Sequence, residues 1–357
     1  MRFGTFHLLT HPPGLTAQDL LQQTLNEAVL AEELGFDTCW LTEHHGSRYG
    51  LSSNPAVLAA AIAARTQRIR LGFAAHITPM HHPVRLAEQV AMVDQLSGGR
   101  VIAGFGAGYS PYEFSMVGAD FETRHGTHWE IVDLVRELWT QPQVTHRGEL
   151  FDLEGAASFP KPLQQPHPPM AISAMSPFSS SVRYAAEMEF IPISANFIGN
   201  WSVKSHWQVY AEEAEKHGRT ADPEIWRVAK NIHIADTDAE AEAFVKQPGG
   251  SFDWYFDYLY RIFDRAQMKG AFVVNKGDDA SELTHDMLRD NYTLYGSPET
   301  VAEKILALRE DIGHFGTLVL TAQDWVDADA MKRSMTLLAE EVMPKVNAAS
   351  GSQAAAD

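Results

Sequence analysis

Residues 38–75 read TCWLTEHHGSRYGLSSNPAVLAAAIAARTQRIRLGFAA and place a strand, a helix and a second strand in succession. The first strand is the short apolar run Thr38–Leu41, and the second is Ile69–Ala75. Between them, the alanine-rich segment from about Pro55 to Thr66 has a helical composition. Two strands that are joined through a helix lie parallel in one sheet, so this stretch predicts an α/β protein.

The same alternation continues on both sides of this stretch. Eight strands are predicted, at residues 2–8, 38–41, 69–75, 101–106, 170–174, 191–194, 228–235 and 317–320. Helices are predicted at 16–34, 55–66, 83–96, 128–139 and 177–188, whereas 109–169 is otherwise polar and proline-rich. Eight such units in 357 residues favour a (β/α)8 TIM barrel with insertions over an open doubly wound sheet. We expect one barrel domain over 1–347 and a disordered tail of small polar residues at 348–357.

The composition is that of an ordinary soluble protein, with 45% hydrophobic and 21% charged residues. The formal charge of −18 argues against nucleic acid and anionic membranes as partners, because both attract a basic surface. The single cysteine, Cys39, fits a reducing compartment. No segment approaches the ~20 apolar residues that cross a bilayer, and MRFGTFHLL lacks the pattern of a signal peptide. We therefore expect a cytoplasmic protein.

The C-terminal ends of the predicted strands carry the candidate chemistry, because side chains from all units of a barrel converge there. The second strand ends in Glu43-His44-His45. The third, fourth and fifth strands end in small residues, as in Ala74-Ala75 and Gly104-Phe-Gly-Ala-Gly-Tyr109. Three neighbouring ends without bulk leave room for a flat ligand, although tight turns that favour glycine and alanine explain them equally well.

The fifth strand is followed by Met175-Ser-Pro-Phe-Ser179, a pattern typical of a helix start. Ser176 is the expected N-cap, with Pro177 at the first helical position. The free N–H groups of such a terminus, together with the hydroxyls of Ser176 and Ser179, suit a phosphate group. Ordinary capping also explains Ser176 without any ligand.

The paired histidines offer two kinds of site. His44 and His45 can be metal ligands, but adjacent side chains point in different directions and the first strand lacks a His-x-His pair. We therefore expect no metal. A neutral histidine that is oriented by Glu43 and acts as an acid or base near neutral pH is the functional hypothesis.

Several stretches together resemble the bacterial luciferase-like flavin monooxygenases: MRFGTFHLL, GFDTCWLTEHH, SSNPAVLAAAIAARTQRIRLGFAAHITPMHHPVRLAEQVAMVDQLSGGR, FPKPLQQPHPPMAISAMSP, NIHIADTDAEAEAF and YGSPETVAEKILAL. The terpene and cyclic-ketone monooxygenases are the most similar branch. The resemblance implies a (β/α)8 barrel that takes reduced FMN from a separate flavin reductase. It implies that O2 and this flavin oxygenate a small apolar or carbonyl-containing substrate, by Baeyer–Villiger insertion or hydroxylation. It also implies a homodimer.

The resemblance assigns roles to individual residues. His44 is implied to be the catalytic acid/base beside the flavin, and the ring is expected to lie against a cis peptide between Ala74 and Ala75. Ala107 stands where the family usually has a phosphate-binding arginine, and Arg124 is expected to compensate. The full set of expected flavin-binding residues is Glu43, Ala74, Ala75, Gly106, Arg124, Met175, Ser176 and Ser179.

Two alternative functions remain open, and one aromatic segment has two possible explanations. A deazaflavin-dependent dehydrogenase shares this barrel, and a flavin-binding protein without catalysis is also compatible with the sequence. In the aromatic run 252–263, five side chains fall on one helical face: Phe252, Tyr255, Phe256, Leu259 and Phe263. This face is explained either by core packing or by the lining of a lid, of which 277–282 is the expected flexible part.

Overall fold

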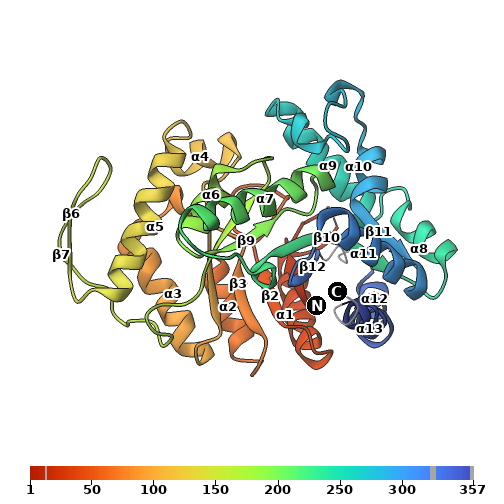
Figure 1. The fold of residues 1–357 in the computed structure, drawn as a ribbon, viewed down its shortest axis with the longest axis horizontal. Helices are drawn as coiled ribbons and strands as arrows, with labels where there is room; N and C mark the ends of the chain where they lie inside the picture. The colour runs from red at the N-terminus through yellow and green to blue at the C-terminus, as the bar shows by residue number, and fades with distance from the viewer. Residues whose placement is uncertain (13, 322–326, 354–357) are drawn as a thin grey trace.

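The computed structural model describes residues 1–12, 14–321 and 327–353, and its centre is a closed barrel of parallel strands (Figure 1). The barrel strands are β1 (Arg2–His7), β2 (Thr38–Leu41), β3 (Arg70–Phe73), β5 (Val101–Gly106), β8 (Met170–Ala174), β9 (Ile191–Ser194), β10 (Arg227–Ile234) and β12 (Thr317–Thr321). Each pairs with the next in this order, and β12 pairs with β1 with Thr317 opposite Arg2. The predicted (β/α)8 barrel and its eight strands are confirmed.

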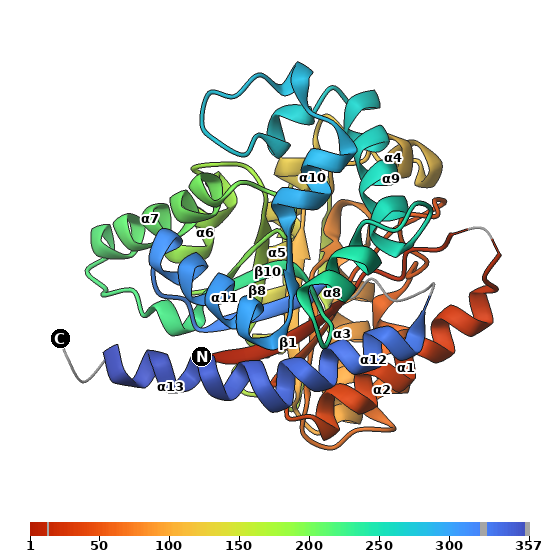
Figure 2. The same cartoon turned by 90° about the vertical axis from the view of Figure 1, so that its right-hand side faces the viewer.

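Helices surround this barrel on its outer surface (Figures 1 and 2). They are α1 (Ala17–Glu33), α2 (Pro55–Ala63), α3 (Pro83–Ser97), α5 (Arg124–Thr140), α6 (Ser180–Glu187), α7 (Asn200–Lys216), α11 (Pro298–Ile312) and α12 (Ala328–Leu337). The start and end of α1 follow from its sequence. The Thr16 side chain accepts a hydrogen bond from the Asp19 amide, and Gly35 after the helix has a φ of 85°.

The barrel interior is filled by side chains that point inward from alternate strand positions. One cluster consists of Trp40, Ile102, Ala171, Ile193, Ala229 and Val319, all buried. The largest of them, Trp40, packs against Gly72 of the neighbouring strand, where a Cβ would overlap the indole. A second and larger apolar cluster lies between the strands and the helices. This division into an inner and an outer core is what a closed barrel requires.

Four strands of the described chain lie outside the predicted set. β4 (His76–Ile77) follows the cis peptide between Ala74 and Ala75 and pairs with β5. β11 (Thr293–Gly296) pairs with the second half of β10. β6 (Val144–Arg147) and β7 (Asp152–Ala156) form an antiparallel hairpin away from the barrel. Both strands are too short and polar to show the two-residue hydrophobic period of a strand in the sequence.

The segment between β10 and β12 carries α8 (Asp238–Val245), α9 (Ser251–Arg265) and α10 (His285–Tyr292). Figure 2 shows α9 and α10 at the same end of the molecule as α4 (Pro111–Val117), opposite α12 and α13 (Met343–Gln353). The five aromatic and aliphatic side chains on one face of α9 are almost completely buried, so core packing is the correct explanation of that face. The flexibility of 277–282 stays a prediction.

The C-terminal helices form one continuous element, because a single π-helical turn, Leu338–Val342, joins α12 to α13. This helix includes residues 348–353, which belong to the segment predicted to be a disordered tail. The last four residues of that segment, 354–357, lie outside the described residues. Among the helices that the structure describes, none combines the length and the apolar character of a membrane span.

The close approach of β3 and β5 generates the first prediction. A Cβ on Gly104 would overlap the main-chain carbonyl of Phe73, and a main chain cannot move aside as a side chain can. Gly104→Ala should therefore lower the free energy of unfolding by about 3 kcal/mol or more, at the upper end of the range for overpacking.

Gly126→Ala is the matched control, because Gly126 lies within α5 and a Cβ there would meet nothing within 4 Å. This substitution should raise the free energy of unfolding by about 0.5–1 kcal/mol through helix propensity. Chemical denaturation measures both variants. Equal stabilities of the Gly104→Ala variant and the wild type would show that the two strands can separate without cost.

Candidate active site

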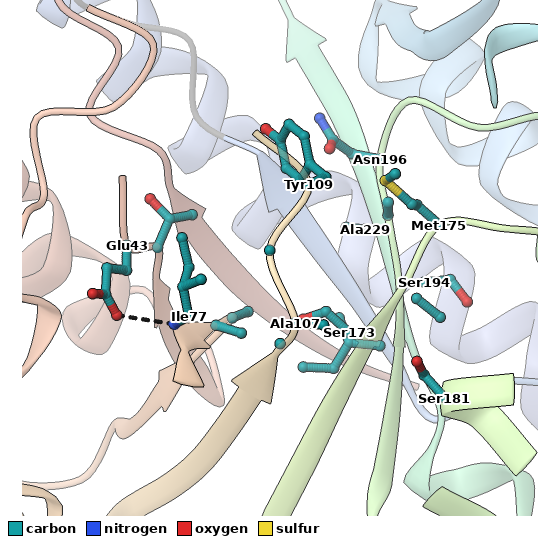
Figure 3. Close-up of a pocket in the computed structure, with 18 of the residues that line it drawn as sticks. Glu43, Ile77, Ala107, Tyr109, Ser173, Met175, Ser181, Ser194, Asn196 and Ala229 are labelled. Atoms are coloured by element: carbon teal, nitrogen blue, oxygen red, sulfur yellow. Dashed lines mark hydrogen bonds between the residues drawn. The ribbon is translucent and has the colours of Figure 1, made fainter. Parts of the chain in front are cut away.

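A cavity of about 290 Å³ opens at the C-terminal ends of the barrel strands. Seven barrel strands contribute to its lining, through Phe6, Trp40, Gly106, Ser173, Ser194, Ala229 and Val319. Figure 3 shows side chains from several strand ends facing one another across this space, with Glu43 on one side and Ser181 and Ser194 on the other. Convergence of the strand ends therefore produces one candidate site, as the barrel topology predicts.

One wall of the cavity is built from small residues. Ala74, Ala75, Gly106 and Ala107 line it, and a Cβ on Gly106 would lie 3.2 Å from the Cβ of Ala75. The peptide between Ala74 and Ala75 is cis, as the resemblance implies. Because no side chain longer than a methyl group projects from these four residues, a planar ring has room to lie against the main chain.

Beside this wall lies a carboxylate cluster, formed by Glu43, His45, His76 and His81. Glu43 Oε1 accepts hydrogen bonds from His45 Nε2 at 2.8 Å and from His81 Nε2 at 2.7 Å. Its Oε2 accepts from His76 Nδ1 at 3.3 Å and from the Ile77 amide at 3.0 Å, the bond drawn in Figure 3. Burial by itself raises the pKa of Glu43, but the bonds from the three imidazoles outweigh it and hold the pKa well below its ordinary value.

The carboxylate cluster also has the composition of a metal site. The ligand atoms of Glu43, His76 and His81 lie within 4.8 Å of one another. Both oxygens of Glu43 already accept hydrogen bonds, and one of these comes from a main-chain amide. Hydrogen bonding therefore accounts for the cluster without an ion, and its position at the ends of β2 and β3 makes it a brace for the small-residue wall.

His44 is oriented by Glu113 of α4, so the prediction that Glu43 orients it is wrong. The distance from His44 Nδ1 to Glu113 Oε1 is 3.1 Å, and both side chains are buried. A carboxylate only accepts hydrogen bonds, so Nδ1 carries the proton and Nε2 is the nitrogen that remains for a ligand. His45 bonds to Glu43 instead, and the two adjacent histidines do not converge on one point.

Arg124 and several serines add polar groups to the lining of the cavity. The Arg124 guanidinium lies 3.7 Å over the ring of Phe121 and donates to the Phe121 carbonyl at 2.7 Å. Its Nε is buried, and no group in the described part of the chain accepts from it. The hydroxyl-bearing residues Ser176, Ser179 and Ser181 line the same cavity.

The helix after β8 begins later than predicted. α6 starts at Ser180 and its N-cap is Ser179, whose side chain accepts from the Ser181 amide, so Ser176 is not the cap. The chain is not helical before this point, because Phe178 has a φ of 51° and its amide donates to Ser205 of α7. Ser176 and Ser179 are both retained in the cavity lining, but only Ser179 lies at a helix terminus.

A buried hydrogen-bond chain fixes the Ser176 main chain. His206 Nε2 donates to the Ser176 carbonyl at 2.9 Å, so Nδ1 is the acceptor and receives the Ser194 hydroxyl proton at 2.8 Å. Ser194 Oγ in turn accepts from Trp226 Nε1 at 2.9 Å. Burial lowers the pKa of His206 to about 4, despite the opposing effect of the Ser176 carbonyl. This imidazole therefore stays neutral and holds the loop that leads to α6.

All nine residues predicted from the sequence for the site lie in the lining of this one cavity: His44, Glu43, Ala74, Ala75, Gly106, Arg124, Met175, Ser176 and Ser179. The sequence reasoning missed Glu113, which follows His44 by 69 residues and has no local signal. It also gave no role to Tyr49, Tyr109 or Asn196, which line the cavity too. Tyr109 ends the glycine-rich segment at the end of β5. Its place at a strand end could have marked it as a site residue.

The mouth of this (β/α)8 barrel combines a flat main-chain wall with an oriented imidazole, an arrangement that suits a planar ligand. Comparison with known proteins identifies the family. The family described as luciferase-like monooxygenase matches residues 1–314. The chain therefore belongs to the luciferase-like monooxygenase family.

Two relatives match nearly the whole chain. The chain is 32% identical to 3,6-diketocamphane 1,6-monooxygenase of Pseudomonas putida, over 95% of this chain and 97% of the relative. It is 31% identical to 4-hydroxyprotoasukamycin monooxygenase of Streptomyces nodosus subsp. asukaensis, over 97% and 92%. A solved structure, the oxygenating constituent of 3,6-diketocamphane monooxygenase from Pseudomonas putida in complex with FMN, superimposes with a TM-score of 0.87 at 32% identity, covering 97% and 98% of the two chains.

The buried His206 generates a prediction about pH. Its pKa falls from 6.5 to about 4 on folding, so the unfolded chain binds this proton more tightly than the folded one. The free energy of unfolding should therefore decrease as the pH is lowered from about 6.5 to 4, with the uptake of about one proton on unfolding.

His206→Asn keeps a polar group at this position but cannot titrate. Urea unfolding at several pH values should show a shallower dependence on pH for this variant than for the wild type across the same window. Other buried histidines contribute equally to both proteins, so the difference isolates His206. Parallel pH profiles of the two proteins would contradict the assignment.

Proposed function

We propose that the chain is the oxygenating component of a two-component system, that a separate flavin reductase supplies its reduced FMN, and that it acts on a small, apolar, carbonyl-containing substrate by Baeyer–Villiger oxygen insertion. The combination of the small-residue wall with His44 in one cavity carries this proposal. When bound, reduced FMN supplies the electrons for O2, of which one oxygen atom enters the substrate and the other leaves as water.

The residues present fit FMN in two respects. Ala74, Ala75 and Gly106 carry almost no side-chain bulk, so the flavin ring system could lie directly against their main chain. Arg124 has a buried N–H group without an acceptor among the described residues, and an anionic phosphate would satisfy it. We assign Met175, Ser176 and Ser179 to the same phosphate end, where Ser181 adds a further hydroxyl.

His44 is assigned the catalytic role. Glu113 holds the proton on Nδ1, so Nε2 is free to accept a proton or to hold one at the reacting end of the substrate. Glu113 is thus a positioning residue for His44. Glu43 is assigned to the support of the flavin wall rather than to proton transfer, because the carboxylate cluster engages both of its oxygens.

Much of the remaining lining is apolar. Leu8, Phe197 and Val319 face the cavity together with the aromatic side chains of Phe6 and Trp40. An apolar pocket favours a hydrophobic substrate. Removal of water by these side chains would also limit the loss of the flavin's electrons as hydrogen peroxide.

Surface exposure, net charge and cysteine content bear on the partners and the location of the protein. Val57 of α2 and Met92 and Leu96 of α3 are exposed by 68%, 52% and 66%, and exposed apolar side chains on adjacent helices support a homodimer. The strongly negative charge supports a small-molecule substrate rather than nucleic acid or a membrane. The lone buried Cys39 supports a cytoplasmic location.

Arg124 gives a prediction about flavin binding. Arg124→Ala removes a charge-assisted contact worth about 1.5–3 kcal/mol, so the dissociation constant for FMN should rise about tenfold or more. Flavin fluorescence titration measures it. Arg136→Ala is the matched control, because Arg136 lies on the same helix and pairs with Asp133 outside the cavity. An unchanged dissociation constant in the Arg124→Ala variant would remove Arg124 from the phosphate site.

His44 and Glu113 give the test of the function itself. With a flavin reductase, NADH, FMN and cyclic ketones, mass spectrometry should detect lactone formed by the wild type. His44→Ala should abolish the lactone while FMN affinity changes less than twofold, and electrons from the flavin should appear as hydrogen peroxide. Glu113→Gln weakens the orientation of His44, so it should lower the rate of lactone formation about tenfold or more. Full activity of the His44→Ala variant would dismiss the proposed role.

A further inference from the structure

Two asparagines on neighbouring strands form a buried amide pair at the edge of the cavity. Asn196 lies in the loop that follows β9, lines the cavity and is only 3% exposed. Asn231 of β10 is completely buried beside it. We refer to these two residues as the amide pair. The roles assigned to His44 and to the flavin wall leave the amide pair without a function, although one of its members faces the ligand space.

The main chain fixes the orientation of the Asn231 side chain. Its Nδ2 donates to the Tyr292 carbonyl at 2.9 Å and to the Asn196 carbonyl at 3.4 Å. A carbonyl oxygen can only accept a hydrogen bond, so the nitrogen of this amide, and not its oxygen, faces the two carbonyls. The Oδ1 atom of Asn231 therefore points to the Asn196 side chain.

The orientation of Asn196 follows from that of Asn231. Asn196 Nδ2 donates to Asn231 Oδ1 at 2.9 Å, and it also donates to the Tyr255 hydroxyl oxygen at 3.1 Å. If the Asn196 amide were turned over, two acceptor oxygens would face each other across the amide pair. The partners of Asn231 exclude this arrangement, so Oδ1 of Asn196 is fixed as an acceptor that points away from Asn231.

Asn196 Oδ1 is the atom of the amide pair that remains for a ligand. Within the part of the chain that the structure describes, no N–H or O–H group donates to it, whereas Nδ2 has two acceptors. Figure 3 shows Asn196 among the side chains that border the cavity. A buried acceptor without a donor is unfavourable, so this site favours a ligand that brings an N–H or O–H group to Asn196.

Ring contacts connect the amide pair to the reactive side of the cavity. Tyr255, the second acceptor from Asn196, stacks on Tyr49 with ring centres 6.3 Å apart. The ring of Tyr49 in turn lies 4.8 Å from the His44 imidazole. Figure 3 shows Asn196 well apart from Ser181, which lies at the end assigned to the phosphate. The fixed acceptor is therefore placed to meet the substrate.

We propose that Asn196 Oδ1 accepts a hydrogen bond from a hydroxyl group of the substrate, and that Asn231 imposes this acceptor role. The substrate class is thereby narrowed to ketones that carry a hydroxyl group in addition to the carbonyl. A hydroxyl group is neutral, which suits a lining that is largely apolar. The inference rests on the proposed function and adds the second polar group of the substrate and the residue that recognises it.

The test compares ketones in which fluorine, which cannot donate a hydrogen bond, replaces the hydroxyl group. One pair is 4-hydroxycyclohexanone and 4-fluorocyclohexanone. The other is 5-hydroxy-2-adamantanone and 5-fluoro-2-adamantanone, on a larger ring system. Intrinsic tryptophan fluorescence of the FMN-loaded protein gives the dissociation constants. The wild type should bind the hydroxyl compound of at least one pair about 2- to 10-fold more tightly than the fluoro compound, the value of one neutral hydrogen bond.

Three variants locate this preference. Asn196→Ala removes the acceptor and leaves room for a water molecule beside Asn231, so the preference for the hydroxyl compound should be lost. Asn231→Ala frees the Asn196 amide to turn over, and the preference should fall to an intermediate value. This variant tests the amide pair even if Asn196→Ala does not fold, which circular dichroism shows. Asn291→Ala is the matched control and should keep the preference, because Asn291 of α10 is exposed and donates to the Met287 carbonyl outside the cavity.

The ring N–H group of the flavin is a second source of the same chemistry and is tested with 3-methyl-FMN, in which a methyl group replaces its proton. Suppose that Asn196→Ala removes a wild-type preference for FMN over 3-methyl-FMN and leaves the hydroxyl preference unchanged. Asn196 then recognises the flavin, and its assignment to the substrate is overturned. The assignment also fails if the wild type shows no hydroxyl preference in either pair, or if Asn196→Ala and Asn231→Ala both retain it.

Product formation separates this inference from the proposed function. Flavin-dependent oxygenation of the panel of cyclic ketones is measured in the same wild-type preparations. Product without a hydroxyl preference that depends on Asn196 refutes the inference alone, whereas absence of flavin-dependent product from every ketone refutes the proposed function.

Discussion

The mouth of the barrel depends on one buried carboxylate. Glu43 follows β2, yet it binds the Ile77 amide and His76 after β3 and also His81 beyond them. These bonds tie together the ends of two neighbouring strands on either side of the Ala74–Ala75 peptide. A charge buried to this extent is stable only because several donors surround it. The flat wall of the cavity exists because this carboxylate holds its supporting strands.

A second buried carboxylate, Glu113, binds His44, the residue that follows Glu43. Glu113 reaches His44 from α4, a helix inserted between β5 and α5, while Glu43 takes His45. The motif Glu43-His44-His45 is thereby divided between two carboxylates: Glu43 and His45 belong to the carboxylate cluster, and His44 is held by Glu113. Adjacent residues of an extended segment point to opposite sides, which separates the His44 side chain from those of its two neighbours. The division explains why three titratable residues follow a buried strand.

The sequence by itself determined the barrel and the location of its site. Alternating strand and helix patterns fix a parallel sheet, and eight of them close it, because strand twist brings the last strand beside the first. The small residues at Ala74, Ala75 and Gly106 could be recognised for the same reason, since every parallel strand end lies at one face. Thr16 and Gly35 marked the limits of α1 through local capping, which depends on a few neighbouring residues only.

Only the tertiary structure decided which partners the polar side chains take. His44 and Glu113 are 69 positions apart, and Asn196 binds Asn231 and Tyr255 from two other segments, so no local pattern contains these pairs. The start of α6 was misplaced for a related reason: Ser205 on α7 binds the Phe178 amide and keeps Ser176 and Pro177 out of the helix. Short-range propensity sets which elements form, whereas the direction of a hydrogen bond in the site depends on donors and acceptors that meet only in the folded barrel.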